Sequence, residues 1–158
     1  MLIEIIKSGA AKPQRGFSLV EVLIALVILS VGMLGIAGLY VQSLQAGRTS
    51  LFRHNAVTLA GDVADRIRAN PRARVAYQGG GADHGCVATG TDCSEVQMAA
   101  HDILLWRAQA DGTLPDGDVT VGFDDTVFPP EYTISVDWVE PGDPPEMNYS
   151  IVIPVLDL

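Results

Sequence analysis

A long apolar run near the N-terminus constrains this chain most. Residues 17–41 read FSLVEVLIALVILSVGMLGIAGLYV and contain one charged side chain, that of Glu21. A helix needs about 20 apolar residues to cross a bilayer, so the run is long enough. A carboxylate inside such a helix is unfavourable by about 2.5 to 3.5 kcal/mol near the bilayer centre. The run therefore predicts a membrane-spanning helix in which Glu21 pairs with an opposite charge.

The charges before this run predict its orientation. Lys7, Lys12 and Arg15 precede it, and the positive-inside rule then places the N-terminus in the cytoplasm and the C-terminal part across the membrane. A cleaved secretory signal has a shorter apolar core, of about 7 to 15 residues, followed by a small-residue cleavage site. We therefore expect the chain to stay anchored in the membrane after translocation.

The C-terminal half of the chain is strongly acidic. Residues 75–158 contain fifteen acidic side chains and one basic side chain, that of Arg107. Nucleic-acid binding requires basic surfaces, so this distribution argues against nucleic acid as a partner. The simplest interpretation is a solubilising surface, and an acidic face that docks a partner protein is the alternative.

The periodicity beyond the apolar run predicts that the helix continues. Apolar residues recur at steps of three and four on one stripe, at Phe52, Ala56, Leu59, Val63 and Ile67. Asp62 and Arg66 are four residues apart and would form a weak surface pair. Asn70 would end the helix as a left-handed cap, followed by Pro71. One helix is thus expected to about residue 69, with an apolar membrane half and an amphipathic half.

Shorter elements are expected after this helix. A loop covers 71–93, and Ser94 begins a capping box for a helix of about 94–110. Alternating apolar residues predict three strands, at 119–123, 132–139 and 149–155, with a turn over 141–146. The apolar stripe of the long helix is available to cover this sheet. The expected fold is α+β: a long N-terminal helix packed on a small antiparallel β-meander, with a helix-containing αβ-loop between them.

Two cysteines, Cys86 and Cys93, lie in the part expected to be translocated. An oxidising compartment favours a disulfide between them. In the chain-entropy model, a closed loop of this length contributes about 2.5 kcal/mol at most. A metal site is the alternative, and His84 is the only further ligand nearby.

The phrase RGFSLVEVLIAL, residues 15–26, resembles the class III signal of type IV prepilins and of the related pseudopilins of type II secretion. Those proteins have a short basic leader, a Gly, then Phe or Met, and Glu at the fifth mature position, which here is Glu21. The resemblance implies that prepilin peptidase cleaves between Gly16 and Phe17 and that Phe17 is N-methylated. It also implies a leader over 1–16, a membrane and assembly helix over 17–41, and a periplasmic pilin-like domain over 42–158.

Cleavage at this point would create a new α-amino group at the membrane surface. The amine of Phe17 and the carboxylate of Glu21 are complementary charges in a poorly solvating environment. An amine of one chain that reaches the glutamate of its neighbour would neutralise both charges at once. Such pairing would set the axial register between subunits, because an unpaired carboxylate in the apolar core is costly.

A second stretch, LAGDVADRIRANPRA over 59–73, resembles PilV-type minor pilins. The resemblance implies a role in starting pilus assembly, in twitching motility and in adhesion, with a position at or near the pilus tip. The implied partners are FimU-, PilW-, PilX- and PilE-like minor pilins, the major pilin, a tip adhesin and the inner-membrane assembly platform. The implied location is the inner membrane, with the C-terminal domain in the periplasm, and then the pilus.

Two alternatives to this function stay open. One is a minor pseudopilin of the I class in type II secretion; the long leader and the pair Cys86 and Cys93 favour the pilus. The other is a membrane-anchored binding module that does not polymerise. A major pilin is disfavoured because no cysteine follows Cys93, which leaves out the usual C-terminal disulfide loop.

The remaining polar residues predict no catalysis. His54, His84 and His101 form no catalytic set by their spacing, and we expect no enzyme activity, cofactor or small-molecule substrate. An acidic run over 111–125 matches no EF-hand loop, so we expect a solvated turn and no metal site there; a calcium site, which some pseudopilins have in a comparable loop, is the alternative. Three glycines over 32–38 have two interpretations, which are close helix packing through small residues or a helix that unwinds in a filament.

Overall fold

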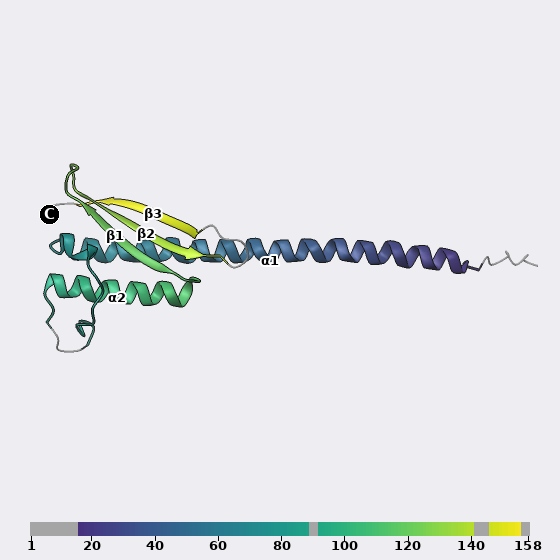
Figure 1. Ribbon diagram of the computed structural model, residues 1–158, viewed down its shortest axis with the longest axis horizontal. Helices are drawn as coiled ribbons and strands as arrows, with labels where there is room; N and C mark the ends of the chain where they lie inside the picture. The colour runs from purple at the N-terminus through teal and green to yellow at the C-terminus, as the bar shows by residue number, and fades with distance from the viewer. Residues whose placement is uncertain (1–15, 89–91, 141–145, 156–158) are drawn as a thin grey trace, which may run out of the picture. The chain divides into compact units, whose positions relative to one another are not determined.

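The computed structural model describes residues 16–88, 92–140 and 146–155 (Figure 1). Its elements, in chain order, are α1 (Leu19–Ala69), the 3-10 helix η1 (Arg74–Gln78), α2 (Glu95–Thr113), β1 (Asp118–Asp124), β2 (Glu131–Val139) and β3 (Glu146–Pro154). The chain divides into two compact units, Met1–Leu44 and Gln45–Leu158. The predicted α+β fold, a long N-terminal helix followed by a helix and a three-stranded antiparallel sheet, is confirmed.

The first unit contains the apolar part of α1. Ser18 lies at the N-cap position, where its main-chain carbonyl accepts a hydrogen bond of 3.2 Å from the Val22 amide and its hydroxyl oxygen one of 3.4 Å from the Val20 amide. By length and composition α1 is able to cross a membrane, and none of its most apolar segment is buried within the chain. Such a surface is stable when lipid or neighbouring helices cover it.

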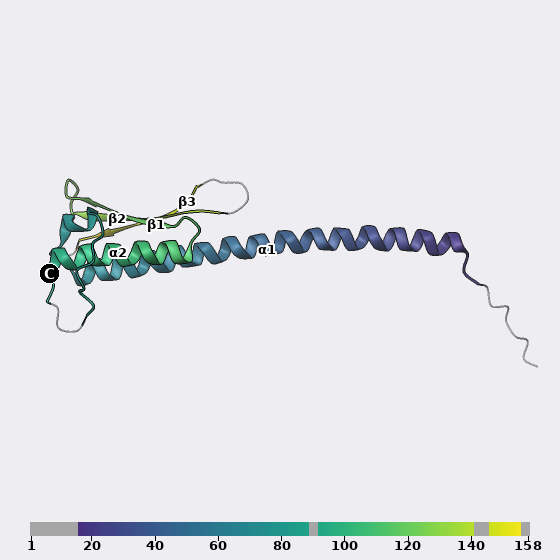
Figure 2. The same cartoon turned by 60° about the horizontal axis from the view of Figure 1, so that its bottom comes forward.

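In the second unit, two helices lie on one face of the sheet. The C-terminal part of α1 and the whole of α2 run side by side, with the sheet on one side of both (Figures 1 and 2). The predicted capping box at the start of α2 is present, because the Ser94 hydroxyl accepts from the Gln97 amide and the Gln97 side chain accepts from the Ser94 amide. The predicted start of this helix is therefore confirmed.

The sheet is an antiparallel meander in the order β1-β2-β3. Its register pairs Val119 of β1 with Val136 of β2, and Tyr132 of β2 with Ile153 of β3. On β2 the buried side chains are those of Tyr132, Ile134, Val136 and Trp138. This alternation confirms the predicted apolar face.

The apolar stripe of α1 packs in the same core as this face. Ala56, Leu59, Val63 and Ile67 are buried, and Phe52 is half-buried against them. Two further small residues, Ala60 and Ala64, are also buried and lie in the same core. The stripe predicted from the sequence is therefore confirmed.

Several local predictions were wrong. Among the described residues only Arg74, Asp116 and Gly85 have positive φ, so Asn70 is not a left-handed cap. Its side-chain amide instead donates to the Glu95 carbonyl at 2.9 Å, which fastens the end of α1 to the start of α2. The predicted loop after Pro71 contains η1, and β3 begins at Glu146 rather than at 149 because its pairing with β2 continues to Val139.

Candidate functional site

The predicted cleavage point lies immediately before α1. Gly16, Phe17 and Ser18 are exposed and not helical, and 83% of Phe17 is accessible. A Cβ added at Gly16 would meet no atom within 4 Å. Apart from Gly16, the predicted leader over 1–16 lies outside the described residues. The Gly16–Phe17 bond is therefore an open stretch of main chain that another protein is able to approach.

Glu21 lies in the first turn of α1 and is exposed. Phe17, Glu21, Val22, Ala25, Leu26 and Leu29 line one shallow apolar groove on this part of the chain. None of the ion pairs found in the described part of the chain involves Glu21. The positive end of the helix dipole compensates its charge only in part. Among the described residues, the carboxylate thus lies on an apolar surface without a counter-charge.

After cleavage, Phe17 would carry a positive charge close to the Glu21 carboxylate. Phe17 precedes Glu21 by four residues, about one helical turn, and both line the same groove. A free α-amino group on Phe17 would be positively charged near neutral pH. An amine and a carboxylate presented on the same apolar surface are able to pair between neighbouring helices.

The three glycines of the apolar part of α1 lie within an unbroken helix. Gly32, Gly35 and Gly38 are all helical and exposed, and a Cβ at any of them would meet no atom within 4 Å. Among the residues that the structure describes, these positions thus have no packing partner. Both interpretations of the glycines require an assembly and stay predictions.

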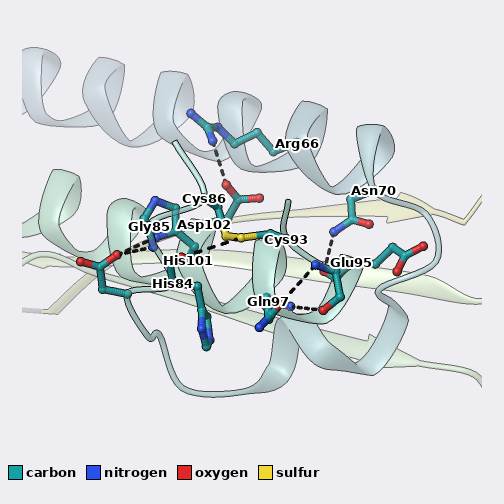
Figure 3. Close-up of a disulfide and its surroundings, with 12 residues drawn as sticks. Arg66, Asn70, His84, Gly85, Cys86, Cys93, Glu95, Gln97, His101 and Asp102 are labelled. Carbon is teal, nitrogen blue, oxygen red and sulfur yellow. Dashed lines mark hydrogen bonds and ion pairs between the residues drawn. A yellow bond between two sulfur atoms is a disulfide. The ribbon is translucent and has the colours of Figure 1, made fainter. Parts of the chain in front are cut away.

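The predicted disulfide between Cys86 and Cys93 is present (Figure 3). The two Cα atoms are 5.7 Å apart, within the ordinary range for a bridge. Both sulfur atoms are used in this bond, so neither is a thiolate ligand for a metal. The alternative of a metal site with His84 therefore loses its two sulfur ligands.

A polar network that sequence reasoning missed joins three elements next to this loop, and Figure 3 shows its pair of Arg66 and Asp102. Asp102 of α2 is buried, and its carboxylate accepts a bond of 2.8 Å from the Arg66 guanidinium of α1. The Tyr77 hydroxyl of η1 donates to the same carboxylate at 3.4 Å and accepts from the Asn70 amide at 3.3 Å. The expected surface pair of Asp62 with Arg66 is thus wrong, because Arg66 reaches the buried Asp102 instead.

The Tyr77 hydroxyl in this network has a raised pKa. Burial, opposed by the hydrogen bond from Asn70 and reinforced by the nearby Asp102 charge, raises the pKa of Tyr77 to about 12. The neutral hydroxyl is therefore the form that this part of the fold contains at ordinary pH. The network therefore has a structural role: it connects α1, α2 and η1.

The neighbouring His101 of α2 packs next to the loop that leads to the disulfide. Its side chain is buried, and its Nδ1 atom lies 3.3 Å from the Asp83 carboxylate, a contact whose geometry falls short of a hydrogen bond. The loop approaches α2 closely, since a Cβ on Gly81 would lie 2.7 Å from the Leu104 amide nitrogen. Glycine is therefore required at position 81, where the loop passes α2. His101 contributes to the domain by packing.

The acidic run has structural partners in several places. Asp118 pairs with Arg107 at 3.3 Å, and Asp124 caps a turn by accepting bonds from the Thr126 amide and hydroxyl. These bonds lower the pKa of the Asp124 carboxyl. Within the described ranges, no group of three or more His, Cys, Asp or Glu side chains could hold a metal ion.

Comparison with protein families finds two adjoining matches. Residues 11–37 match the prokaryotic N-terminal methylation motif, and residues 38–104 match the family model of the type IV pilin Tt1218. The first match contains Gly16, Phe17 and Glu21, and the second contains both cysteines and Asp102. No curated protein and no solved structure matches the chain.

Proposed function

We propose that this chain, which belongs to the type IV pilin family, is a minor pilin that takes part in starting pilus assembly. Type IV pilins are structural proteins and not enzymes, and the methylation motif implies processing by prepilin peptidase and assembly into a pilus. The chain would act by packing its N-terminal helix among the helices of other pilins.

One observation carries this proposal, namely the exposed Glu21 on an apolar helix surface. Its carboxylate has no counter-charge among the described residues, and it shares a groove with Phe17. Cleavage after Gly16 supplies the missing cation as the Phe17 amine. A neighbouring subunit that offers this amine to Glu21 removes an otherwise uncompensated charge from the apolar core.

The stretch 59–73 supports the PilV-type assignment within the family. Two residues of this stretch connect the elements of the domain: Arg66 pairs with Asp102, and Asn70 holds the start of α2. On this assignment the chain lies at or near the pilus tip with FimU-, PilW-, PilX- and PilE-like minor pilins and a tip adhesin. It resides in the inner membrane before assembly and in the pilus afterwards, where it supports twitching motility and adhesion.

Variants of Glu21 test the assembly mechanism. In cells that express the full chain at its natural level, Glu21→Val and Glu21→Gln should lower incorporation into sheared pili by about tenfold or more, the equivalent of about 1.4 kcal/mol. Asp62→Asn is the matched control, since Asp62 is an exposed acid of the same helix outside the apolar run. Incorporation of the Glu21 variants at the control's level would contradict the proposal. A non-polymerising anchored module would behave in that way.

A further inference from the structure

The two edges of the sheet differ in how their main-chain groups are satisfied. On the outer edge of β1, the Val119 carbonyl accepts from the Arg107 guanidinium at 3.4 Å, and the Phe123 carbonyl accepts from the Gln78 amide at 3.0 Å. These donors come from α2 and from η1. The β1 edge is therefore capped by side chains, one of the ways in which proteins prevent unwanted strand pairing.

The same bonds fix which groups of β3 point outward. The carbonyls of Val119 and Phe123 point away from β2, so the main-chain groups of the odd-numbered residues of β1 form no hydrogen bonds with β2. Their partners on β2, Val136 and Tyr132, therefore form their main-chain hydrogen bonds with β3. Tyr132 pairs with Ile153, so the odd-numbered residues of β3 point toward β2. The even-numbered residues of β3 then direct their amides and carbonyls to the open edge.

The outward set contains Asn148, Ser150, Val152 and Pro154. Pro154 has no amide hydrogen, and proline occurs in sheets at such outward positions. Within the described ranges, no hydrogen bond in the structure uses the main-chain groups of Asn148, Ser150 or Val152 at this edge. As far as the described residues show, the β3 edge thus presents a row of donors and acceptors without partners.

The apolar side chains along this edge are also only partly buried. Met147, Tyr149 and Ile151 point to the core side of the sheet but are only half-buried. At the C-terminal end of β3, an apolar pocket is lined by Ile67 of α1 and by Ile153 and neighbouring residues. One more strand at this edge would bury these three apolar side chains and bond the free main-chain groups.

We propose that the β3 edge is a docking site for an extended strand of a different pilin subunit. The proposal rests on the proposed function and specifies how a minor pilin partner binds. The docked strand would present apolar side chains beside Tyr149 and Ile151. On its other face it would present polar and basic side chains, since Asp137 and Glu146 lie on the solvent face there and Asn148 already donates to Asp137.

A second copy of this chain does not fit the edge. Two domains that point the same way, with their sheets in the same plane, would bring the β1 edge of one to β3 of the other. That β1 edge is capped by Arg107 and Gln78. Antiparallel β3–β3 pairing would reverse one domain relative to the other. Parallel β3–β3 pairing would place the apolar inner face of one sheet beside the polar outer face of the other.

A proline at the edge tests the proposal directly. Ser150→Pro removes one outward amide and blocks strand approach, yet should leave the fold intact because that amide does not bond to β2. Ser150→Ala is the matched control: it removes the same hydroxyl contact with Ser135 and keeps the amide. Equal melting temperatures of the two full-length variants in detergent would establish that Ser150→Pro folds. If Ser150→Pro does not fold, Val152→Pro is used in its place, with Val152→Ala as its control.

Binding is measured between the full-length chain and each minor pilin produced with it, in the same detergent. For one of these partners we expect Ser150→Pro to weaken binding by about tenfold or more and Ser150→Ala to bind like the wild type. Residue-resolved hydrogen exchange should show new protection at Asn148, Ser150 and Val152 in that complex. Equal binding of the proline and alanine variants, or protection confined to α1, would overturn the strand proposal. Such a result would leave the pilin function intact, because that function is tested separately by Glu21.

Discussion

Arg66 of α1 and Asp102 of α2 form an ion pair with 2.8 Å between Nη1 and Oδ1, and the Asp102 side chain is only 4% exposed. The pair joins the amphipathic part of the long helix to the helix of the αβ-loop. Because the carboxylate also accepts from Tyr77, one buried charge holds three elements of the domain together.

Removal of the arginine should therefore destabilise the domain. Arg66→Ala leaves Asp102 buried without its cation, and we expect the free energy of unfolding to fall by about 1 to 3 kcal/mol. Arg68→Ala is the matched control, since its partner Asp65 is 78% exposed and such surface pairs contribute about 0 to 1 kcal/mol. Denaturant unfolding of the full chain in detergent measures both values. Equal destabilisation by the two variants would show that the Asp102 network is not an anchor.

The disulfide should stabilise the domain without affecting membrane insertion. The double variant Cys86→Ser/Cys93→Ser releases the closed loop, which lowers the free energy of unfolding by about 2.5 kcal/mol at most in the chain-entropy model. We expect a lower melting temperature and faster proteolysis of the domain, with the chain still in the membrane fraction. An unchanged melting temperature would mean that the bridge contributes nothing to stability.

The raised pKa of Tyr77 predicts a loss of stability in alkali. A phenol whose pKa is about 12 in the folded chain and about 10 in the unfolded chain favours folding below pH 10. This contribution, of about 2 to 3 kcal/mol, is lost as the pH rises from about 10 to about 12. Denaturant midpoints between pH 8 and pH 11.5 should fall steeply for the wild type and less steeply for Tyr77→Phe. Parallel curves would exclude Tyr77 as the titrating group.

Local patterns predicted much of the fold. Tyr132, Ile134, Val136 and Trp138 alternate with polar residues because only one face of β2 is buried, and such a period is visible in the sequence. Glu21 was identifiable in the same way, as a lone charge within an apolar run. The disulfide followed from the expected compartment of its two cysteines.

The missed features depend on contacts between distant residues. Arg66 has an acid four residues before it, yet its partner Asp102 lies 36 positions further along the chain. No local pattern distinguishes these two acids, because burial of Asp102 results from packing. The open edge at Ser150 depends on the strand register and on the donors Gln78 and Arg107, so it is visible only in the folded domain.

Mass spectrometry of the N-terminal peptide, from sheared surface filaments and from inner membranes in parallel, tests whether the chain is cleaved before Phe17 and assembled. A minor pilin that is cleaved and assembled should yield a peptide that begins at Phe17 with an N-methyl group in the filament fraction. A chain that retains residues 1–16 in both fractions would contradict this, because the Phe17 amine proposed to pair with Glu21 would not exist.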